Sequence, residues 1–313
     1  VNNFLMRSEF DFIHHIKKKY GLGHIGDDCA VLPYNDETDL LVTSDMLTED
    51  IDFRLEWTTP ELLGHKALAV SLSDIAAMGG RPNWAMLTIG GPEHLWNGDF
   101  LDRFYDGWHK LADQHEVELI GGDVSRVADK LVIDSTVIGQ VPRGKAILRS
   151  GAKPGDGIYV TGSLGGAAAG LRLLESGRRM TDDDSPESRL IDRQLAPRPR
   201  LDLAVKLITA AGITAMIDLS DGLSSDLRHI CVASRCGAEI DAAKIPVDPD
   251  ISILDTAFDD RLDLSLNGGE DFELLFTADP KNFSSPADAE ITRIGTVTAT
   301  VDSIELISEG ERR

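Results

Sequence analysis

A long helix near the start of the chain places the strongest constraint on its fold. The stretch ALAVSLSDIAAMGG at 67–80 consists almost wholly of small or apolar residues. Thr59 can cap a helix that runs into this stretch, and Pro60 suits its first position. The glycine pair at the end can stop it. We therefore predict a helix over 60–78.

Asp74 carries the only charge within that apolar stretch. A charge is rarely buried in a protein unless it is paired or bound to a metal ion. Asp74 is therefore a candidate metal ligand. The alternative is a carboxylate satisfied within the core, for example by Ser71 or by a backbone amide.

A second group of carboxylates lies at a predicted β-hairpin. Two short apolar runs, CAVL and LLVT, flank the turn-rich residues PYNDET. A hairpin centred on residues 36–37 places Asp28 opposite Asp45, with Asp27 beside them. Like charges held together repel each other, and a divalent cation relieves that repulsion. A solvated polar strand end is the alternative.

Three more acidic motifs follow, each of which would be ordinary alone. They are GGD at 121–123, IDLSDGLSSDL at 217–227 and NGGEDFELLF at 267–276. Glycine pairs let a ligand approach the backbone but also make common turns. An Asp or Ser before a helix can cap it, whereas the helix N-terminus can also face phosphate. Together the five acidic groups, spread over both halves of the chain, predict a multi-metal site shared between two domains.

The hydrophobic patterning predicts an α+β first half and an α/β second half. In the first half we expect a mostly antiparallel sheet with helices on one face, built from a helix at 10–20, the hairpin, the helix at 60–78, strands at 84–91, 117–122 and 130–141, and a helix at 100–115. In the second half we expect a strand at 158–161, a helix at 164–176, an acidic loop at 181–188, a helix at 200–211, a strand at 214–218, a helix at 222–235 and a strand at 271–277.

The length of 313 residues predicts two domains. The Gly- and Pro-rich stretch SGAKPGDG at 150–157 is the best boundary, which gives domains of 1–149 and 150–313. GLGHIG at 21–26 matches a dinucleotide-binding pattern literally. Since a helix precedes it and a strand follows it, the context argues against a Rossmann turn. The chain has no Walker A motif either.

The formal net charge is −22, which argues against partners such as nucleic acid or an anionic membrane, since both need a basic surface. Any anionic substrate needs cations as intermediaries. The three cysteines, Cys29, Cys231 and Cys236, form neither a disulfide framework nor a zinc site, and they fit a reducing cytoplasm. The first residues, VNNFLMRSEFDF, lack the apolar run of a signal peptide, and no apolar run is long enough to span a membrane.

Seven motifs, in the right order and with plausible spacing from about Glu9 to Thr277, resemble one known family. They are IGDDCAVL, LVTSD, HKALAVSLSDIAAMGGRP, LIGGDVSR, RSGAKPGDGIYVTG, IDLSDGLSSDL and GGEDFELLF. The combination resembles the thiamine-monophosphate kinase family of the aminoimidazole-ribonucleotide synthetase superfamily. The resemblance implies transfer of the γ-phosphoryl group of ATP to thiamine monophosphate, which gives thiamine diphosphate, with several Mg²⁺ ions as cofactors. It also implies two α/β domains and a homodimer whose N-terminal domains, which bind ATP and Mg²⁺, close a β-barrel.

The resemblance also assigns roles to individual residues. The implied metal ligands are Asp28, Thr43, Ser44, Asp45, Asp74, Asp123, Asp218 and Asp221. The implied ATP contacts are Tyr105, Gly122, Asp123, Arg149 and Ser220. Glu270 would bind the thiamine substrate, and no residue matches a dedicated catalytic base. Asp52 stands where the family usually has a substrate histidine, and no aromatic residue follows Phe283, although the family usually has one near its C-terminus.

Other activities fit the residues less well. Selenophosphate synthetases resemble this layout but carry a reactive Cys or selenocysteine in an N-terminal Gly-rich loop, whereas Cys29 lies in a predicted strand. A hydrogenase-maturation relative ends in Cys, whereas this chain ends in Arg313. A ring-closing aminoimidazole-ribonucleotide synthetase remains the better alternative within the superfamily. An acidic protein that binds cations without catalysis is the alternative from another class.

Overall fold

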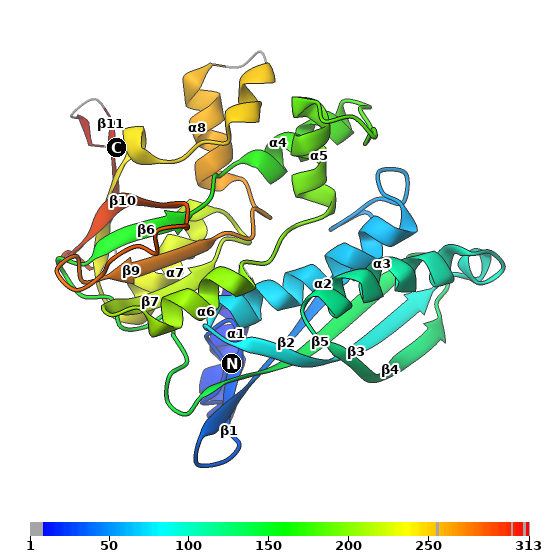
Figure 1. The fold of residues 1–313 in the computed structure, drawn as a ribbon, viewed down its shortest axis with the longest axis horizontal. Coiled ribbons are helices and arrows are strands. Elements are labelled where there is room, and N and C mark those ends of the chain that lie inside the picture. Colours follow the sequence, from blue (N-terminus) through cyan, green and yellow to red (C-terminus); the bar gives the residue numbers. More distant parts are fainter. Residues whose placement is uncertain (1–8, 255–256, 302, 309–310, 313) are drawn as a thin grey trace, which may run out of the picture.

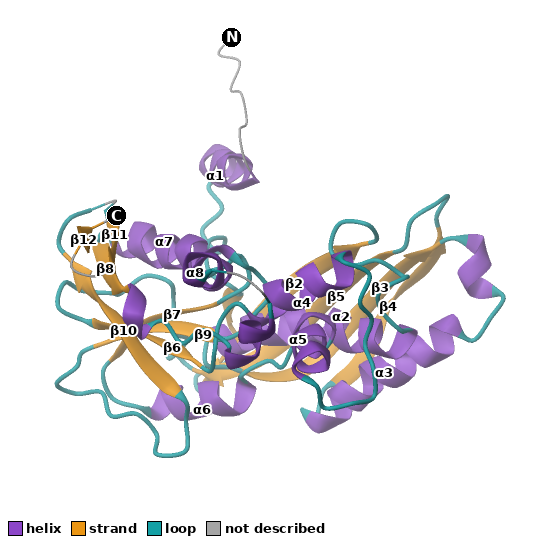
Figure 2. Ribbon diagram, turned by 90° about the horizontal axis from the view of Figure 1, so that it is seen from above, coloured by secondary structure: helices purple, strands orange, loops and turns teal. Residues whose placement is uncertain are grey.

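The computed structural model describes residues 9–254, 257–301, 303–308 and 311–312. Two sheets with their own helices lie side by side, and α2 (Pro60–Ala77) runs between them (Figure 1). The view from above shows the same two-part arrangement, with α1 (Glu9–Tyr20) projecting from it (Figure 2). No helix in the described part of the chain is long and apolar enough to cross a membrane.

The first sheet has five strands, in the order β1-β2-β5-β3-β4. Only β3 and β4 pair in parallel; the other neighbours are antiparallel. The strands are β1 (Ala30–Pro33), β2 (Thr38–Thr48), β3 (Arg81–Gly91), β4 (Glu118–Arg126) and β5 (Val132–Pro142). The helices α2 and α3 (Phe100–Gln114) cover one face of this sheet (Figure 1). The predicted antiparallel sheet with helices on one face is therefore confirmed, and as a single chain the sheet is open.

The signals that predicted α2 act as expected. The side chain of Thr59 accepts a hydrogen bond from the backbone N–H of Leu62 at 3.3 Å, and Pro60 is the first helical residue. The helix is buried along most of its length, since its small side chains let the sheets approach it closely.

The second sheet has seven strands, in the order β12-β11-β8-β10-β6-β9-β7, and only β11 and β8 pair in parallel. Its strands are β6 (Gly157–Thr161), β7 (Ile213–Asp218), β8 (Gly237–Asp241), β9 (Leu274–Ala278), β10 (Ile291–Thr298), β11 (Ile304–Ser308) and β12 (Glu311–Arg312). Its α-helices are α4 (Gly166–Glu175), α5 (Pro186–Leu195), α6 (Leu201–Thr209), α7 (Leu223–Ser234) and α8 (Phe258–Asn267). Short 3₁₀ helices complete the description: η1 (Glu93–Trp96), η2 (Ala242–Lys244) and η3 (Pro249–Ile253).

The main hydrophobic cluster extends across both parts of the chain. It contains Leu72 and Met78 of α2 together with Leu201 of α6 and Phe276 of β9, all buried. The predicted domain boundary between residues 149 and 150 lies in the connection from β5 to β6 and stays a prediction. The three cysteines are buried, and none of them forms a disulfide in the described part of the chain.

Several predicted details were wrong. The hairpin pairs Ala30 with Val42, one residue away from the predicted register, and its ladder starts after Asp28. Strand β4 continues through GGD to Arg126, because residues 121–126 pair with β3, so GGD does not end the strand. Strand β9 begins only at Leu274, since the GGED residues form a loop beside β7.

The predicted acidic loop at 181–188 contains the start of a helix. Ser185 caps α5 by accepting a hydrogen bond from the N–H of Ser188 at 3.2 Å, and Pro186 occupies the first position. The helix α8 and the strands β8, β10, β11 and β12 were not predicted either. Strands β8 and β10 pair with strands that lie far away in sequence, so local patterning carries little information about them.

Candidate active site

Three carboxylates from three elements meet where α2 contacts both sheets. Asp28 precedes β1, Asp74 lies in α2, and Asp218 ends β7. One carboxylate oxygen of each lies within 4.8 Å of those of the other two. Asp28 is 8% exposed and Asp218 is 2% exposed, so water shields these charges poorly. The structure thus brings together residues from three of the five acidic groups noted in the sequence.

Strand β2 adds Thr43 and Asp45 to this cluster. The hydroxyl of Thr43 donates a hydrogen bond to Oδ2 of Asp74. Oδ2 of Asp28 and Oδ2 of Asp45 are buried and accept no hydrogen bond from any described residue. Ser71, the alternative partner expected for Asp74, instead donates to a backbone carbonyl of β5.

The electrostatics of this cluster favour a bound cation. Burial raises the pKa of Asp74 well above its usual value, and the charges of Asp45, Asp218 and Asp28 raise it further. Burial and the charge of Asp28 raise the pKa of Asp218 to about 7. Burial also raises the pKa of Asp28, although Arg149, whose Nη2 lies 2.6 Å from Oδ1, partly offsets that rise. Crowded, partly unpaired carboxylate oxygens are the ligand set that Mg²⁺ prefers.

A second group of possible ligands follows β7 at the start of α7. Single ligand atoms of Asp221, Asp226 and His229 lie within 4.8 Å of one another. Burial raises the pKa of Asp226 to about 8, and the charges of Asp218 and Asp221 add to the effect. The sequence interpretation included Asp221 but missed Asp226 and His229, which lie one and two helical turns further along. The spacing of Asp226 and His229, which puts both on one face of a predicted helix, was the signal for them in the sequence.

The loop GGED, residues 268–271, lies against the residues that follow β7. The N–H of Glu270 donates to the carbonyl oxygen of Ser220 at 2.8 Å. A Cβ atom at position 269 would stand 2.5 Å from that same oxygen, so only glycine permits this contact. The implied substrate residue Glu270 and the implied ATP residue Ser220 are therefore neighbours.

The carboxylate of Glu270 is held by residues from two other elements. Its Oε2 lies 2.8 Å from Nζ of Lys66 on α2 and accepts a second hydrogen bond from the amide of Gln194 on α5. The backbone of Glu270 has φ +66°, a conformation that residues with side chains adopt rarely and mostly at functional sites. The sequence interpretation missed Lys66, since a lysine near the start of a helix is usually a solvated residue.

Four other implied site residues lie apart from the carboxylate cluster in one chain. Ser44 points to the face of the first sheet opposite Asp45, and its hydroxyl donates to Asp134 at 3.1 Å. Gly122 and Asp123 lie on β4, three strands from β2. Tyr105 lies on α3, packed edge-on against Phe104.

Asp134 is a site candidate that the sequence interpretation missed. It neighbours Ser44 on the uncovered face of the sheet, and its charge helps to raise the pKa of Asp45, although burial of Asp45 is the larger cause. The alternation of inward and outward side chains along β5 was the one signal for Asp134 in the sequence.

Asp52 lies in the turn after β2. Its Oδ2 accepts a hydrogen bond from the N–H of Thr48 at 2.7 Å, which closes that turn. Its role toward a substrate stays a prediction.

Comparisons of family, sequence and structure place this chain among the same group of known proteins. Residues 26–141 and 153–306 match the N-terminal and C-terminal domains of the AIR synthase related proteins. The thiamine-monophosphate kinase of Escherichia coli (strain K12) is 39% identical over 315 residues, which cover 98% of this chain and 93% of that protein. The thiamine-monophosphate kinase of Bacillus subtilis (strain 168) is 38% identical over 275 residues, which cover 86% and 83%. A solved structure described as AaThiL complexed with AMPPCP and TMP superposes with a TM-score of 0.88 at 31% identity, covering 99% of this chain and 97% of that one.

Proposed function

The chain belongs to the thiamine-monophosphate kinase family of AIR synthase related proteins, and we propose that it transfers the γ-phosphoryl group of ATP to the phosphate of thiamine monophosphate. The product is thiamine diphosphate. The observation that carries the proposal is the convergence of Asp28, Asp74 and Asp218 from both halves of the chain. Relatives with this name and a similar structure with an ATP analogue and TMP support it.

The same cluster would hold several Mg²⁺ ions. The proposed ligands within one chain are Asp28, Thr43, Asp45, Asp74, Asp218 and Asp221. Bound Mg²⁺ would neutralise the phosphates of both substrates, which carboxylates alone would repel. The fit rests on the all-oxygen donor set and on the buried, unpaired Oδ2 atoms of Asp28 and Asp45.

The chain's own residues bind and orient the phosphates. Arg149 is 21% exposed in its side chain and can turn donors toward an incoming phosphate while it stays beside Asp28. Ser220 lies two residues before Gly222, the N-cap of α7, and backbone N–H groups at a helix N-terminus favour anions. No side chain needs to accept a proton, because a phosphate monoester with a pKa of about 6 already presents an anionic oxygen at neutral pH.

One stripe of α2 orients the acceptor. Lys66 and Ser73 are seven residues apart and therefore lie on the same face of the helix. Lys66 holds Glu270, and Ser73 donates a hydrogen bond of 2.6 Å to Asp218. Seven residues of helix measure about 11 Å along the axis. A substrate with an organic cation at one end and a phosphate at the other can bridge the two points.

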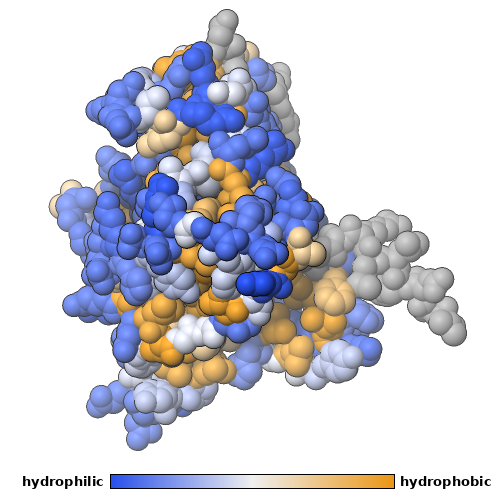
Figure 3. Space-filling model, turned by 90° about the vertical axis from the view of Figure 1, so that its right-hand side faces the viewer, coloured by the Kyte–Doolittle hydropathy of each residue, from blue (hydrophilic) through white to orange (hydrophobic). Residues whose placement is uncertain are grey.

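We further propose a homodimer in which each active site receives residues from both copies. Asp123 and Asp45 are three strands apart in one chain, or about 14 Å. One ion cannot contact both of them within a single copy. The uncovered face of the sheet exposes Met46 by 63% and Met86 by 38%. Figure 3 shows apolar patches among charged residues on the side of the molecule that lies to the right in Figure 1. A second copy placed on this face would supply Gly122 and Asp123 of β4.

A direct assay tests the proposed function. The protein is incubated with ATP, Mg²⁺ and thiamine monophosphate, and thiamine diphosphate is measured. Thiamine serves as the control acceptor, because its hydroxyl needs a base and lacks the phosphate anchor. We expect thiamine diphosphate from the monophosphate and no detectable thiamine monophosphate from thiamine. Equal turnover of both acceptors, or no turnover of either, would overturn the proposal.

A further inference from the structure

Lys66 connects α2 to the loop that carries the proposed substrate carboxylate. Its side chain is 3% exposed, although a lysine is rarely buried without a partner. Its Nζ donates to Oε2 of Glu270 at 2.8 Å and to the backbone carbonyl of Gln194 at 3.2 Å. The neighbouring His65 bonds the carbonyl of Pro197 through Nε2 at 2.8 Å. The start of α2 is thus fastened to the end of α5 and to the GGED loop at once.

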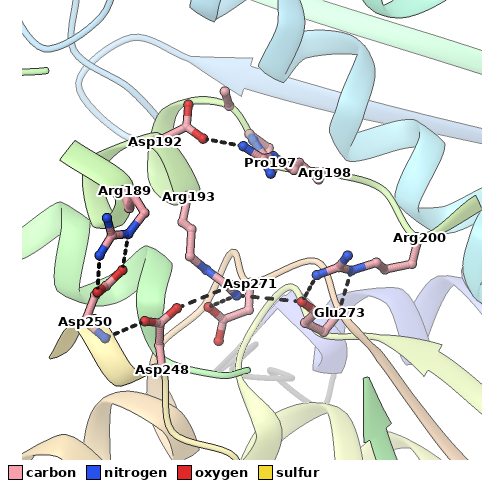
Figure 4. Close-up of a pocket in the computed structure, with 11 residues that line it drawn as sticks. Arg189, Asp192, Arg193, Pro197, Arg198, Arg200, Asp248, Asp250, Asp271 and Glu273 are labelled. Carbon is pink, nitrogen blue, oxygen red and sulfur yellow. Dashed lines mark hydrogen bonds and ion pairs between the residues drawn. The ribbon is translucent and has the colours of Figure 1, made fainter. Parts of the chain in front are cut away.

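The opposite side of the GGED loop is fastened by an arginine network. Arg200 forms a two-pronged ion pair with Glu273, with Nε 2.7 Å from Oε2, and Arg193 lies 3.4 Å from Oδ1 of Asp271. Figure 4 shows both arginines pointing at the segment that contains Asp271 and Glu273. Asp271 also accepts the N–H of Gly165 at 2.6 Å. The backbone around Glu270 is therefore held firmly, and only its side chain remains to be oriented.

The carboxylate of Glu270 divides its two oxygens between protein and solvent. Lys66 and Gln194 both bond Oε2, whereas Oε1 accepts no hydrogen bond from the described residues. The side chain of Glu270 is 27% exposed, so part of it is open to a ligand. A carboxylate oriented in advance loses less conformational freedom when it binds an amino group or an organic cation.

We propose that Lys66 is a positioning residue for the acceptor substrate, which acts by fixing the carboxylate of Glu270 with Oε1 toward the substrate. This inference rests on the proposed function for the identity of the acceptor. Lys66 itself touches no substrate, since its ammonium group is enclosed by the protein. Its removal would leave Gln194 as the remaining side chain that holds Oε2 of Glu270, and acceptor binding would then have to order a less restrained carboxylate.

Direct binding measurements test the proposal. Calorimetry gives the Kd of thiamine monophosphate for the intact protein and for Lys66→Met, Lys66→Arg, Glu270→Gln and the double variant Lys66→Met/Glu270→Gln. We expect Lys66→Met to raise Kd about tenfold, because one long side chain must be ordered and its ion pair is lost. Lys66→Arg should restore most of the affinity. The double variant should bind no more weakly than Glu270→Gln alone, since Lys66 acts through Glu270.

A matched control separates positioning from general effects of losing a lysine. Lys206→Met removes another ion pair, with Asp288 at 2.6 Å, on the far side of α6. It should leave Kd unchanged. KM for ATP should stay within about twofold in Lys66→Met, whereas a merely structural role would change both substrates together. Additive effects in the double variant, or an unchanged Kd in folded Lys66→Met, would overturn the proposal.

Two further measurements keep the outcome clear. If Lys66→Met does not fold, Lys66→Gln takes its place, because it retains a hydrogen-bond donor without the charge. Lys66→Gln should also raise the Kd of thiamine monophosphate. A normal Kd in Lys66→Gln would then contradict the proposal. Turnover by the intact protein is measured first. Absence of thiamine diphosphate there contradicts the proposed function, whereas normal turnover with an unaffected Lys66 variant contradicts only the positioning role.

Discussion

The guanidinium of Arg149 lies 2.6 Å from Oδ1 of Asp28. The side chain of Asp28 is 1% exposed, so this contact is the main compensation for a carboxylate placed deep in an acidic cluster. The resemblance assigned Arg149 to ATP and Asp28 to metal. In the structure they form one ion pair, so a phosphate bound by Arg149 would lie beside the proposed metal ligands.

Arg149→Met should therefore lower the stability of the protein as well as its activity. Removing one partner of a buried ion pair typically costs about 3 kcal/mol, because the other charge stays buried and unpaired. We expect a loss of this order in the free energy of unfolding by urea without Mg²⁺. Added Mg²⁺ should restore part of the stability by neutralising Asp28, but turnover should stay very low. Full recovery of turnover with Mg²⁺ would show that Arg149 acts only on stability.

Asp45→Asn and Asp74→Asn should each lower kcat by several orders of magnitude, while the fold is retained. The amide keeps the size of the side chain but removes the charge that a divalent ion needs. Because both carboxylates have a raised pKa caused first by burial, the substitutions should also raise the melting temperature of the metal-free protein. Circular dichroism and steady-state assays measure the two effects. Near-normal kcat in either variant contradicts the shared metal cluster.

The stability of the metal-free protein should fall as pH rises from about 4 to about 8. An acid whose pKa is raised on folding binds its proton more tightly in the folded protein. Its contribution is present at low pH and is lost as pH passes the folded value. Asp218 and Asp226, with pKa values of about 7 and about 8, set this window. The pKa of Glu61 is lowered to about 2, chiefly by its hydrogen bond from Arg103. Glu61 therefore changes the stability with pH only below this window.

Thermal melts in EDTA and in Mg²⁺ test this dependence. Mg²⁺ should raise the melting temperature more at pH 8 than at pH 5, because the ligands must lose their protons to bind it. Asp218→Asn should flatten the profile in EDTA. A melting temperature that rises from pH 5 to pH 8 without metal would be contrary to expectation.

The sequence predicted those parts of the site that local patterning can show. Asp74 stands out because its neighbours are apolar, and Asp28 and Asp45 stand out because turn residues place them together. The bond between Lys66 and Glu270 could not be predicted in this way, since it joins residues 204 positions apart. The hairpin register was wrong by one residue because several turns fit PYNDET, and only the pairing of Ala30 with Val42 decides among them.

The resemblance assigned roles to residues but could not place those residues in space. Asp45 and Ser44 are adjacent in sequence, yet the alternation of a strand sends them to opposite faces of the sheet. Asp123 appeared to end a strand, but β4 continues past it because β3 offers a parallel partner. The distance between these groups depends on strand order, which local sequence does not contain.

Asp52→Asn and Asp52→Ala should separate two roles of this residue. Asn can still accept the hydrogen bond from Thr48, whereas Ala cannot, so only Ala should lower the free energy of unfolding, by about 1 kcal/mol. If Asp52 replaces the substrate histidine of the family, both variants should raise KM for thiamine monophosphate and leave KM for ATP nearly unchanged. Equal effects on both KM values would assign Asp52 to the fold or the metals.

Mixed dimers should regain activity if two copies build each site. Asp45→Asn and Asp123→Ala are each expected to be inactive alone, since each breaks both sites of a dimer. In a mixed dimer, the chain with Asp123→Ala keeps Asp45, and its partner keeps Asp123, so one site is intact and the other lacks both. Because each mixed dimer has one intact site of two, the purified mixed dimer should show about half of the activity of the unmodified protein. The two chains are co-expressed with different tags, and the doubly tagged dimer is purified and assayed.

As a control, Asp45→Asn paired with Asp74→Asn should stay inactive, because both residues belong to the same cluster within one chain. An inactive Asp45→Asn/Asp123→Ala dimer would mean that Asp123 serves the copy to which it belongs, or no metal at all.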